Sequence, residues 1–215
     1  MSALVLDRIT IALGERRLID SFSLIVAPGT VTTVMGPSGA GKSTLLSYVS
    51  GTLDPVFTGT GHVILGGDEM TYLRPEKRRI GILFQDDLLF PHLSVGDNLA
   101  FGLAASVRGR AERRARIEAA LEEAELSGFA SRDPATLSGG QRQRVAVMRA
   151  LLAEPRALLL DEPFARLDMA LRDRFRAFVF GHALRRGLPV LLVTHDPDDA
   201  RAAAGPVIDL GAPPV

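Results

Sequence analysis

Hydrophobic positions along the chain follow two alternating patterns. Short apolar runs bounded by Gly or Pro are typical of buried strands, and stretches with hydrophobic residues at helical spacing separate them. The expected buried strands are residues 30–35, 80–84, 157–160 and 190–194. Three segments look more like an antiparallel edge, namely residues 4–13, 18–26 and 62–65. The alternation predicts an α/β fold with a mainly parallel sheet core and an N-terminal antiparallel β region.

The middle of the chain has a different pattern, because residues 94–153 contain no convincing strand. Ile117, Leu121 and Ala124 recur at helical spacing among charged residues, which indicates a helical insertion. A second amphipathic helix is expected to begin at Asp168 as its N-cap. Its hydrophobic face comprises Leu171, Phe175, Phe178, Val179 and His182. We find no internal repeat and no long linker, so we predict a single domain with two lobes.

The composition excludes several classes of function. Lys and Arg total 25 and Asp and Glu total 25, so the excess of basic residues typical of a nucleic-acid-binding protein is missing, and we expect no such partner. The sequence has no Cys, which excludes disulfides, thiolate metal sites and cysteine nucleophiles. Residues 1–20 lack the apolar run of a signal peptide, and no apolar stretch approaches the ~20 residues that span a membrane.

A glycine-rich segment follows the expected strand at 30–35 and matches the pattern G-x-x-x-x-G-K-[ST]. Its glycines allow backbone N–H groups to surround phosphate oxygens, Lys42 would reach the terminal phosphates, and the Ser43 hydroxyl would bind Mg²⁺. Only Lys42 and Lys77 among the 25 basic residues are lysines, so chance seldom places a lysine here. A Gly-rich turn is the alternative. The predicted nucleotide-binding residues are Gly36, Pro37, Ser38, Gly39, Ala40, Gly41, Lys42, Ser43 and Thr44.

Two adjacent carboxylates end the apolar run at 157–160. Asp161 would hold Mg²⁺ through water, and Glu162 would be the general base that polarises the attacking water. We expect the two side chains to have different roles because neighbours on a strand point to opposite faces. Without the loop at 36–44, such an acidic strand end would more often be a solvated turn.

A third segment, Leu137-Ser-Gly-Gly-Gln141, precedes a helical pattern. Paired glycines before a helix form a second anion site. One active site has no need of two such sites, so we expect this one to serve the nucleotide of a partner subunit. By itself, Ser-Gly-Gly would more often be a loop.

Together these motifs resemble those of the ATP-binding subunits of ABC transporters, and the likeness runs over nearly the whole chain. In the family's order, residues 36–44 resemble the Walker A loop, Gln85 the Q-loop glutamine, residues 137–141 the signature, residues 158–162 the Walker B segment and His195 the switch histidine. The resemblance implies an ATPase that uses ATP and Mg²⁺. Gln85 would contact Mg²⁺ and the water, and His195 the γ-phosphate. The implied catalytic residues are Lys42, Gln85, Glu162 and His195, and the implied metal ligands are Ser43, Gln85 and Asp161.

The resemblance also implies a head-to-tail dimer that encloses two ATP molecules. The signature residues of one copy would contact the nucleotide of the other, together with Asp168 of the segment called the D-loop in this family; these signature residues are Ser138, Gly139, Gly140 and Gln141. The expected organisation is one ABC ATPase domain, residues 1–215. Residues 1–85 and 154–215 form its nucleotide-binding core, and about residues 86–153 form a helical subdomain.

Residues 84–102 look like the importer subunits for thiamine, polyamines, iron(III) or sulfate. We therefore expect a cytoplasmic ATPase, peripheral on the inner face of the membrane, that binds permease subunits and serves a periplasmic binding protein indirectly. A thiamine-like or other small solute is the expected substrate. The alternatives are a soluble ABC ATPase that acts on DNA, ribosomes or scaffolds, and an exporter ATPase. A P-loop kinase or GTPase is disfavoured by the segment at 137–141.

The sequence departs from the family at two points, and one charged segment has no assigned role. Leu13 stands where an aromatic residue usually stacks on adenine, and Ala165 and Arg166 replace the common Ser-Ala of the D-loop. We interpret the charge run at 108–116 as a solvated helix face, with a basic contact to lipid headgroups or a partner as the less favoured alternative. His62, His92 and His182 are expected to be surface or packing residues.

Overall fold

The computed structural model describes residues 2–165, 167 and 169–210. The chain divides into two compact units, of which the first comprises Met1–Ile82, Arg156–Glu162 and Arg176–Val215. The second comprises Leu83–Pro155 and Pro163–Phe175. The expected helical part at about 86–153 lies inside the second unit, which also takes in residues 163–175.

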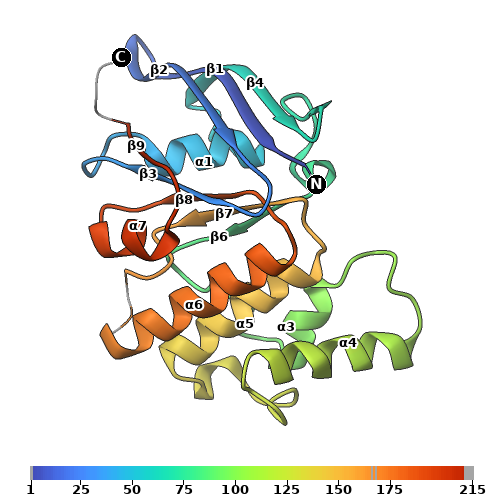
Figure 1. Ribbon diagram of the computed structural model, residues 1–215. Coiled ribbons are helices and arrows are strands. Elements are labelled where there is room, and N and C mark those ends of the chain that lie inside the picture. The colour runs from blue at the N-terminus through green and yellow to red at the C-terminus, as the bar shows by residue number, and fades with distance from the viewer. Residues whose placement is uncertain (1, 166, 168, 211–215) are drawn as a thin grey trace. The chain divides into compact units, whose positions relative to one another are not determined.

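Two sheets form most of the first unit (Figure 1). The antiparallel sheet has the order β2-β1-β4-β5, with β1 at Leu4–Leu13, β2 at Arg16–Val26, β4 at Phe57–Leu65 and β5 at Asp68–Glu69. The other has the order β6-β7-β8-β3-β9, with β3 at Val31–Met35, β6 at Ile80–Leu83, β7 at Ala157–Asp161, β8 at Val190–Val193 and β9 at Val207–Asp209. The parallel pairing of β7 with β8 and of β3 with both β8 and β9 confirms the predicted α/β class. The pattern did not predict β5 or β9.

Helix α1 (Lys42–Ser50) lies between the two sheets (Figure 1). Leu45, Leu46 and Val49 of α1 are fully buried in one hydrophobic cluster with strand residues from both sheets. This packing anchors the first turn of α1, and with it the glycine-rich loop, against the sheet. The other helices of this unit are α2 (Pro75–Arg78), α7 (Pro197–Ala203) and the C-terminal part of α6 (Met169–Arg185).

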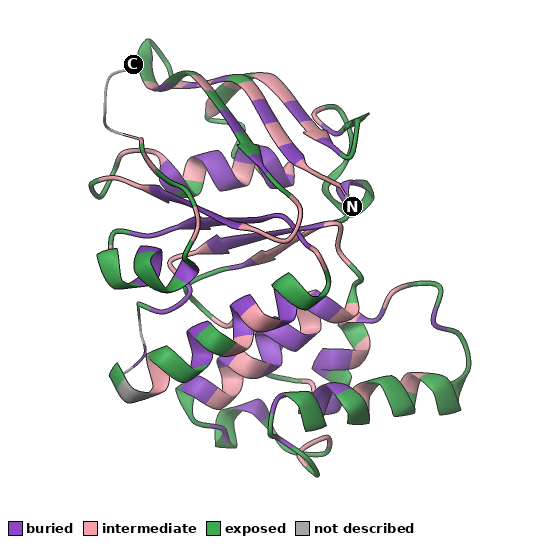
Figure 2. Cartoon of the chain, in the orientation of Figure 1, coloured by how far each residue is buried: buried purple, intermediate pink, exposed green. Residues whose placement is uncertain are grey.

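The second unit is helical, as the sequence predicts, and residues 94–153 contain no strand. It contains α3 (Val95–Gly102), α4 (Arg110–Glu123), a short 3-10 helix at Pro134–Thr136 and α5 (Gly139–Leu152). Gly102 lets α3 approach α5 closely, because a Cβ atom there would lie 2.3 Å from the carbonyl oxygen of Arg149. Helix α4 is mostly exposed (Figure 2), and only Ala120 and Leu121 within it are buried.

Helix α6 confirms the expected second helix, and Phe175, Val179 and His182 of its predicted hydrophobic face are buried, whereas Leu171 and Phe178 are only partly buried. The His182 ring packs on Phe178 at a centroid distance of 4.5 Å, so it is a packing residue. The expected N-cap, Asp168, lies outside the described residues.

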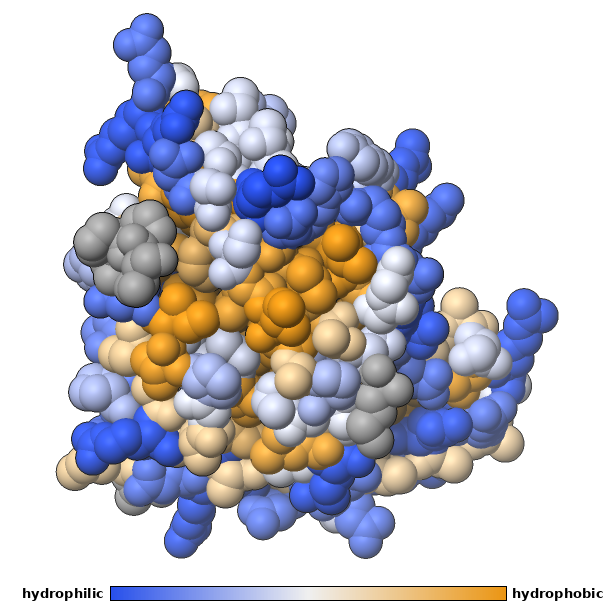
Figure 3. Space-filling view, turned by 45° about the horizontal axis from the view of Figure 1, so that its top comes forward, coloured by the Kyte–Doolittle hydropathy of each residue, from blue (hydrophilic) through white to orange (hydrophobic). Residues whose placement is uncertain are grey.

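The surface carries both polar and apolar groups. On the face shown in Figure 3, hydrophobic residues gather within a border of hydrophilic ones. None of the helices in the described part of the chain combines the length and the hydrophobicity needed to cross a membrane.

Candidate active site

The glycine-rich loop connects β3 to α1. Gly39 and Gly41 have φ angles of 82° and 89°, in the left-handed region that favours glycine. Gly41 is the N-cap, so α1 begins at Lys42. No side chain caps this helix end, and the amide groups of its first turn therefore remain as donors for an anion.

The ammonium group of Lys42 is held over this loop. Its Nζ donates hydrogen bonds to the carbonyl oxygens of Gly36 at 2.8 Å and Pro37 at 3.0 Å, and it lies 4.0 Å from Oε1 of Glu162. Lys42 is only 6% exposed. A buried cation needs partners of this kind, and phosphate oxygens are stronger acceptors than peptide carbonyls.

Ser43 and Asp161 meet at the start of α1. The Ser43 hydroxyl donates a hydrogen bond to Oδ1 of Asp161 at 2.9 Å. Burial raises the pKa of Asp161 above its ordinary value, and Glu162 adds to this rise, whereas the hydrogen bond from Ser43 and the charge of Lys42 oppose it. A partly buried carboxylate beside a hydroxyl is a donor set that suits Mg²⁺.

The fit of Mg²⁺ to this site depends on the nucleotide. Within the described residues, no cluster of three His, Cys, Asp or Glu side chains could hold a metal ion. A cation at Ser43 and Asp161 would therefore need phosphate oxygens and water as its other ligands. Mg²⁺ is commonly bound in this way, by one or two protein ligands together with phosphates and water.

Glu162 contacts His195, another of the predicted catalytic residues. Oε1 of Glu162 lies 3.1 Å from Nδ1 of His195, whose side chain is 57% exposed. Glu162 lies beyond the end of β7 and has a φ of 44°. We predicted different roles for Asp161 and Glu162 because we expected them to be neighbours on one strand, and that reason is wrong. The left-handed backbone at Glu162 sets its direction instead, at a conformational cost typical of functional sites.

A buried network that the sequence analysis missed supports the loop of His195. Thr194 donates from Oγ1 to Oδ2 of Asp199 at 2.7 Å, and Arg176 donates to Oδ1 of the same carboxylate at 2.8 Å from Nε. The Asp196 amide donates back to Oγ1 of Thr194. All three side chains of the Thr194, Arg176 and Asp199 network are less than a tenth exposed. Arg176, a charged residue on the buried side of α6, was the signal in the sequence that could have indicated this network.

The second unit contains the signature segment at the start of α5. Ser138 and Gln141 form a capping box, in which Oγ of Ser138 accepts from the Gln141 amide and Oε1 of Gln141 accepts from the Ser138 amide. Both side chains are thus occupied in capping the helix. The amide groups of Gly139 and Gly140 have no acceptor among the described residues, so they are the donors available to an anion.

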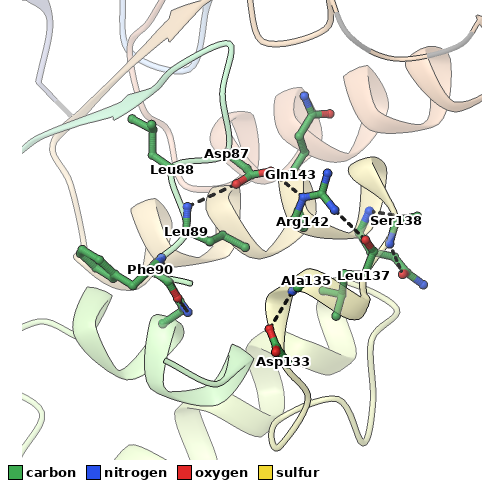
Figure 4. A network of polar contacts seen from close by, with 12 residues as sticks. Asp87, Leu88, Leu89, Phe90, Asp133, Ala135, Leu137, Ser138, Arg142 and Gln143 are labelled. Atoms are coloured by element: carbon green, nitrogen blue, oxygen red, sulfur yellow. Dashed lines mark hydrogen bonds and ion pairs between the residues drawn. The ribbon is translucent and has the colours of Figure 1, made fainter. Parts of the chain in front are cut away.

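Gln85 and the signature line one pocket of the second unit. This pocket has a volume of about 260 Å³, and its walls include Gln85, Asp87, Gly139 and Arg142. Arg142 joins the two segments, because its Nε donates to Oδ2 of Asp87 at 2.9 Å and its Nη1 donates to the carbonyl oxygen of Leu137 at 2.7 Å (Figure 4). The expected nucleotide contact at Asp168 lies outside the described residues.

The predicted residues thus fall into two groups. Lys42, Ser43, Asp161, Glu162 and His195 come together within the first unit. Gln85 and the signature come together within the second. The first group holds two carboxylates, a histidine and a lysine, which are side chains suited to acid–base and phosphate chemistry. The second group holds backbone N–H donors and the Gln85 amide, which are suited to binding an anion.

Comparison with known proteins agrees with these motifs. Residues 19–165 match the family model described as ABC transporter. An uncharacterized ABC transporter ATP-binding protein of Escherichia coli, YnjD, is 49% identical over 207 residues, which are 96% of this chain and 94% of that protein. The Fe(3+) ions import ATP-binding protein FbpC 1 of Haemophilus influenzae is 42% identical over 95% of this chain and 62% of its own length.

Other relatives extend this picture. The sulfate/thiosulfate import ATP-binding protein CysA of Gloeobacter violaceus is 40% identical, over 96% of this chain and 59% of that protein. The chain therefore spans about 60% of the length of these iron and sulfate relatives. Among solved structures, a dimeric post-hydrolysis state of the ATP-binding cassette MJ0796 bound to ADP and Pi has a TM-score of 0.78 and 32% identity, covering 93% of this chain and 90% of that one.

Proposed function

The chain belongs to the ABC transporter family, whose ATP-binding proteins hydrolyse ATP, and we propose that it is the ATPase subunit of a bacterial importer. The observation that carries the catalytic part is the cluster of Lys42, Ser43, Asp161, Glu162 and His195 within one compact unit. In this proposal the first unit is the nucleotide-binding core and the second the helical subdomain.

The residues of the first unit divide the work of hydrolysis. Backbone amides of residues 36–44 and the ammonium group of Lys42 bind the β- and γ-phosphates. Ser43 and Asp161 hold Mg²⁺, which when bound neutralises charge on the phosphate oxygens. Glu162 accepts the proton of the attacking water, and His195, 3.1 Å from Glu162, contacts the γ-phosphate. The resemblance to the family implies that Gln85 would contact the attacking water and the cation.

A second copy of the chain completes each site. The Gly139 and Gly140 amides bind the γ-phosphate held by the partner copy, and Asp168 adds a further contact to the nucleotide. The capping box supports this proposal, because it fixes the helix end and leaves these two amides as donors. MJ0796, the structural relative, is described as dimeric with ADP and Pi bound.

Import is supported by the relatives whose names include iron(III) or sulfate import. The permease subunits and a periplasmic binding protein would contact the solute, so its identity does not depend on residues of this chain. Iron(III), sulfate and a thiamine-like solute are the candidates, of which the relatives' names favour the first two. The chain would then be peripheral on the cytoplasmic face of the membrane.

Substitution of Glu162 by Gln tests the catalytic part. Glu162→Gln keeps the size of the side chain and removes the base, so the variant is expected to bind MgATP and to accumulate as a closed dimer. Light scattering with and without MgATP measures the dimer, and Glu76→Gln, an exposed change on α2, is the matched control. A Glu162→Gln variant that stays monomeric at saturating MgATP would refute the sandwich.

Isolation from native membranes tests the transport part. The tagged chain, extracted in mild detergent, is expected to retain a polytopic permease that mass spectrometry identifies. Recovery with ribosomal, DNA-bound or scaffold proteins instead would leave the ATPase in place and replace the importer by the soluble alternative.

A further inference from the structure

The charges of α4 are separated along its length. Five arginines lie in its first half and the segment just before it: Arg108, Arg110, Arg113, Arg114 and Arg116. Glu112 is the one acidic residue among them. Four glutamates follow in the second half and just after it: Glu118, Glu122, Glu123 and Glu125.

This order is opposite to the one that stabilises a helix. The partial charges of the backbone favour anions in the first turn and cations in the last. Glu112 is the only acidic residue in the first turn of α4, and the last turn has no basic residue. Arg110 and Arg114 are moreover four residues apart, a spacing at which like charges repel. Glu112 and Arg116, and Arg114 and Glu118, are also four residues apart, but the structure shows no ion pair between them. The helix dipole therefore does not account for the arginines.

Packing accounts for one arginine of the five. Arg113 donates to the carbonyl oxygens of Ala100 at 2.9 Å and Val107 at 3.4 Å. The guanidinium groups of the other four, Arg108, Arg110, Arg114 and Arg116, are exposed, and none forms a hydrogen bond or ion pair with a described residue. On α5, by contrast, Arg142, Arg144 and Arg149 all have such partners.

A concave surface adjoins these side chains. A pocket of about 590 Å³ in the second unit is lined by Arg110, Arg113 and Arg114, with Ser94 and Ser131 among the other walls. Asp97 and Glu118 also line it, and the Asp97 carboxylate is already engaged by the Ser94 hydroxyl at 2.6 Å. A phosphate group would find guanidinium groups here that lack another partner.

We propose that this arginine cluster, defined as Arg108, Arg110, Arg114 and Arg116 at the start of α4 and just before it, docks on the headgroups of anionic phospholipids. A cluster of four to eight basic residues at a membrane protein is typical of such contacts. The centres of the basic and acidic halves are about ten residues, hence about 15 Å, apart along the helix. This exceeds the Debye length of about 8 Å at physiological salt, so Glu122, Glu123 and Glu125 do not cancel the attraction, whereas Glu112 and Glu118 lie within about one turn of the arginines and reduce it. The inference rests on the proposed work at a membrane.

Vesicle sedimentation tests the docking. The full chain is mixed with phosphatidylcholine vesicles with and without phosphatidylglycerol, over a range of salt. The test variant replaces Arg108, Arg110, Arg114 and Arg116 by Gln. The control replaces four other exposed basic residues by Gln, namely Arg74, Lys77, Arg174 and Arg201, and so has the same net charge. We expect salt-sensitive binding to the anionic vesicles that falls at least about tenfold in the test variant and little in the control.

Three results would overturn the docking proposal. These are no binding of the wild type to anionic vesicles, an equal loss in the control, and complete competition by millimolar inorganic phosphate, which would indicate a site for soluble anions. Thermal melting checks the fold of the test variant, which is expected to be at least as stable as the wild type because unfavourable charges are removed. MgATP-driven dimerisation in the Glu162→Gln background separates failure of this surface from failure of the ATPase assignment.

Discussion

The ion pair between Asp87 and Arg142 links the segment after Gln85 to the signature, and its removal has calculable consequences (Figure 4). Arg142→Gln removes the bonds to the Asp87 carboxylate and to the carbonyl oxygen of Leu137. The Asp87 carboxylate then still accepts a hydrogen bond from the Leu89 amide at 3.3 Å. The carbonyl oxygen of Leu137, just before Ser138, loses its hydrogen bond from α5. We expect the entrance to the signature to loosen.

The magnitude follows from the type of bond and its exposure. A hydrogen bond to a charged group contributes about 1.5–3 kcal/mol, and leaving a partner unpaired adds to the cost. The side chains of Arg142 and Asp87 are 36% and 25% exposed, so solvent weakens the attraction between them. Arg142→Gln should therefore cost about 2 kcal/mol and Asp87→Asn about 1 kcal/mol. The double variant should cost about 1 kcal/mol less than their sum.

Urea unfolding of the wild type, Arg142→Gln, Asp87→Asn and the double variant measures the coupling energy between the two side chains. Glu125→Gln is the control, because Glu125 pairs at 2.6 Å with Arg144, which lies on the same helix as Arg142, but is itself 78% exposed, so its loss should cost less than about 0.5 kcal/mol. In the Glu162→Gln background, Arg142→Gln should also weaken MgATP-driven dimerisation while monomer binding of ATP persists. Costs that add within about 0.3 kcal/mol would refute the coupling.

Two further predictions concern stability. Gly140→Ala would place a Cβ 2.3 Å from Cδ2 of Leu171, so it should destabilise the chain by about 1–3 kcal/mol in urea unfolding. Gly139→Ala meets nothing nearer than 3.9 Å and should cost less than about 0.5 kcal/mol; equal costs would contradict the clash. Burial tends to raise the pKa of Glu69, but hydrogen bonds from Thr71 and His62 hold it below its ordinary 4.5. The Glu69 carboxylate therefore contributes to the stability of the fold above pH 4.5, and this contribution is lost as the pH falls through the lower pKa of the folded state. The difference in unfolding free energy between wild type and Glu69→Gln should shrink in that pH window. A pH-independent difference would contradict this.

The strands were predictable where the apolar pattern was continuous, and their ends were not. Strand β4 begins at Phe57, five residues before the expected segment, because Gly59 and Gly61 interrupt the pattern. Tertiary packing requires both glycines, since a Cβ at Gly59 would lie 2.4 Å from the Tyr48 ring and one at Gly61 would lie 2.5 Å from the Arg8 carbonyl oxygen. Such contacts are not local, so no window of sequence contains them.

The candidate site, in contrast, was largely predictable from the sequence. Its motifs are local, because a loop that must wrap a phosphate needs glycines at fixed spacing from a lysine. The supporting contacts join distant positions, as Asp87 does with Arg142 across 55 residues and Arg176 with Asp199 across 23. Neither pair has a pattern that distinguishes it from other exposed-looking charges in the sequence. The structure alone identifies them.

The two helix starts differ in a way that fits their proposed tasks. Gly41 caps α1 without a side chain, so the first-turn amides of α1, the loop amides and Lys42 can all face phosphate oxygens. At α5 the Ser138 hydroxyl takes the Gln141 amide, which leaves the two glycine amides. A site that must hold a whole triphosphate needs many donors, whereas a site that closes on a single γ-phosphate and later releases it needs few. Strong capping at α5 thus limits the strength of the second contact, as the proposed dimer would need in order to reopen after hydrolysis.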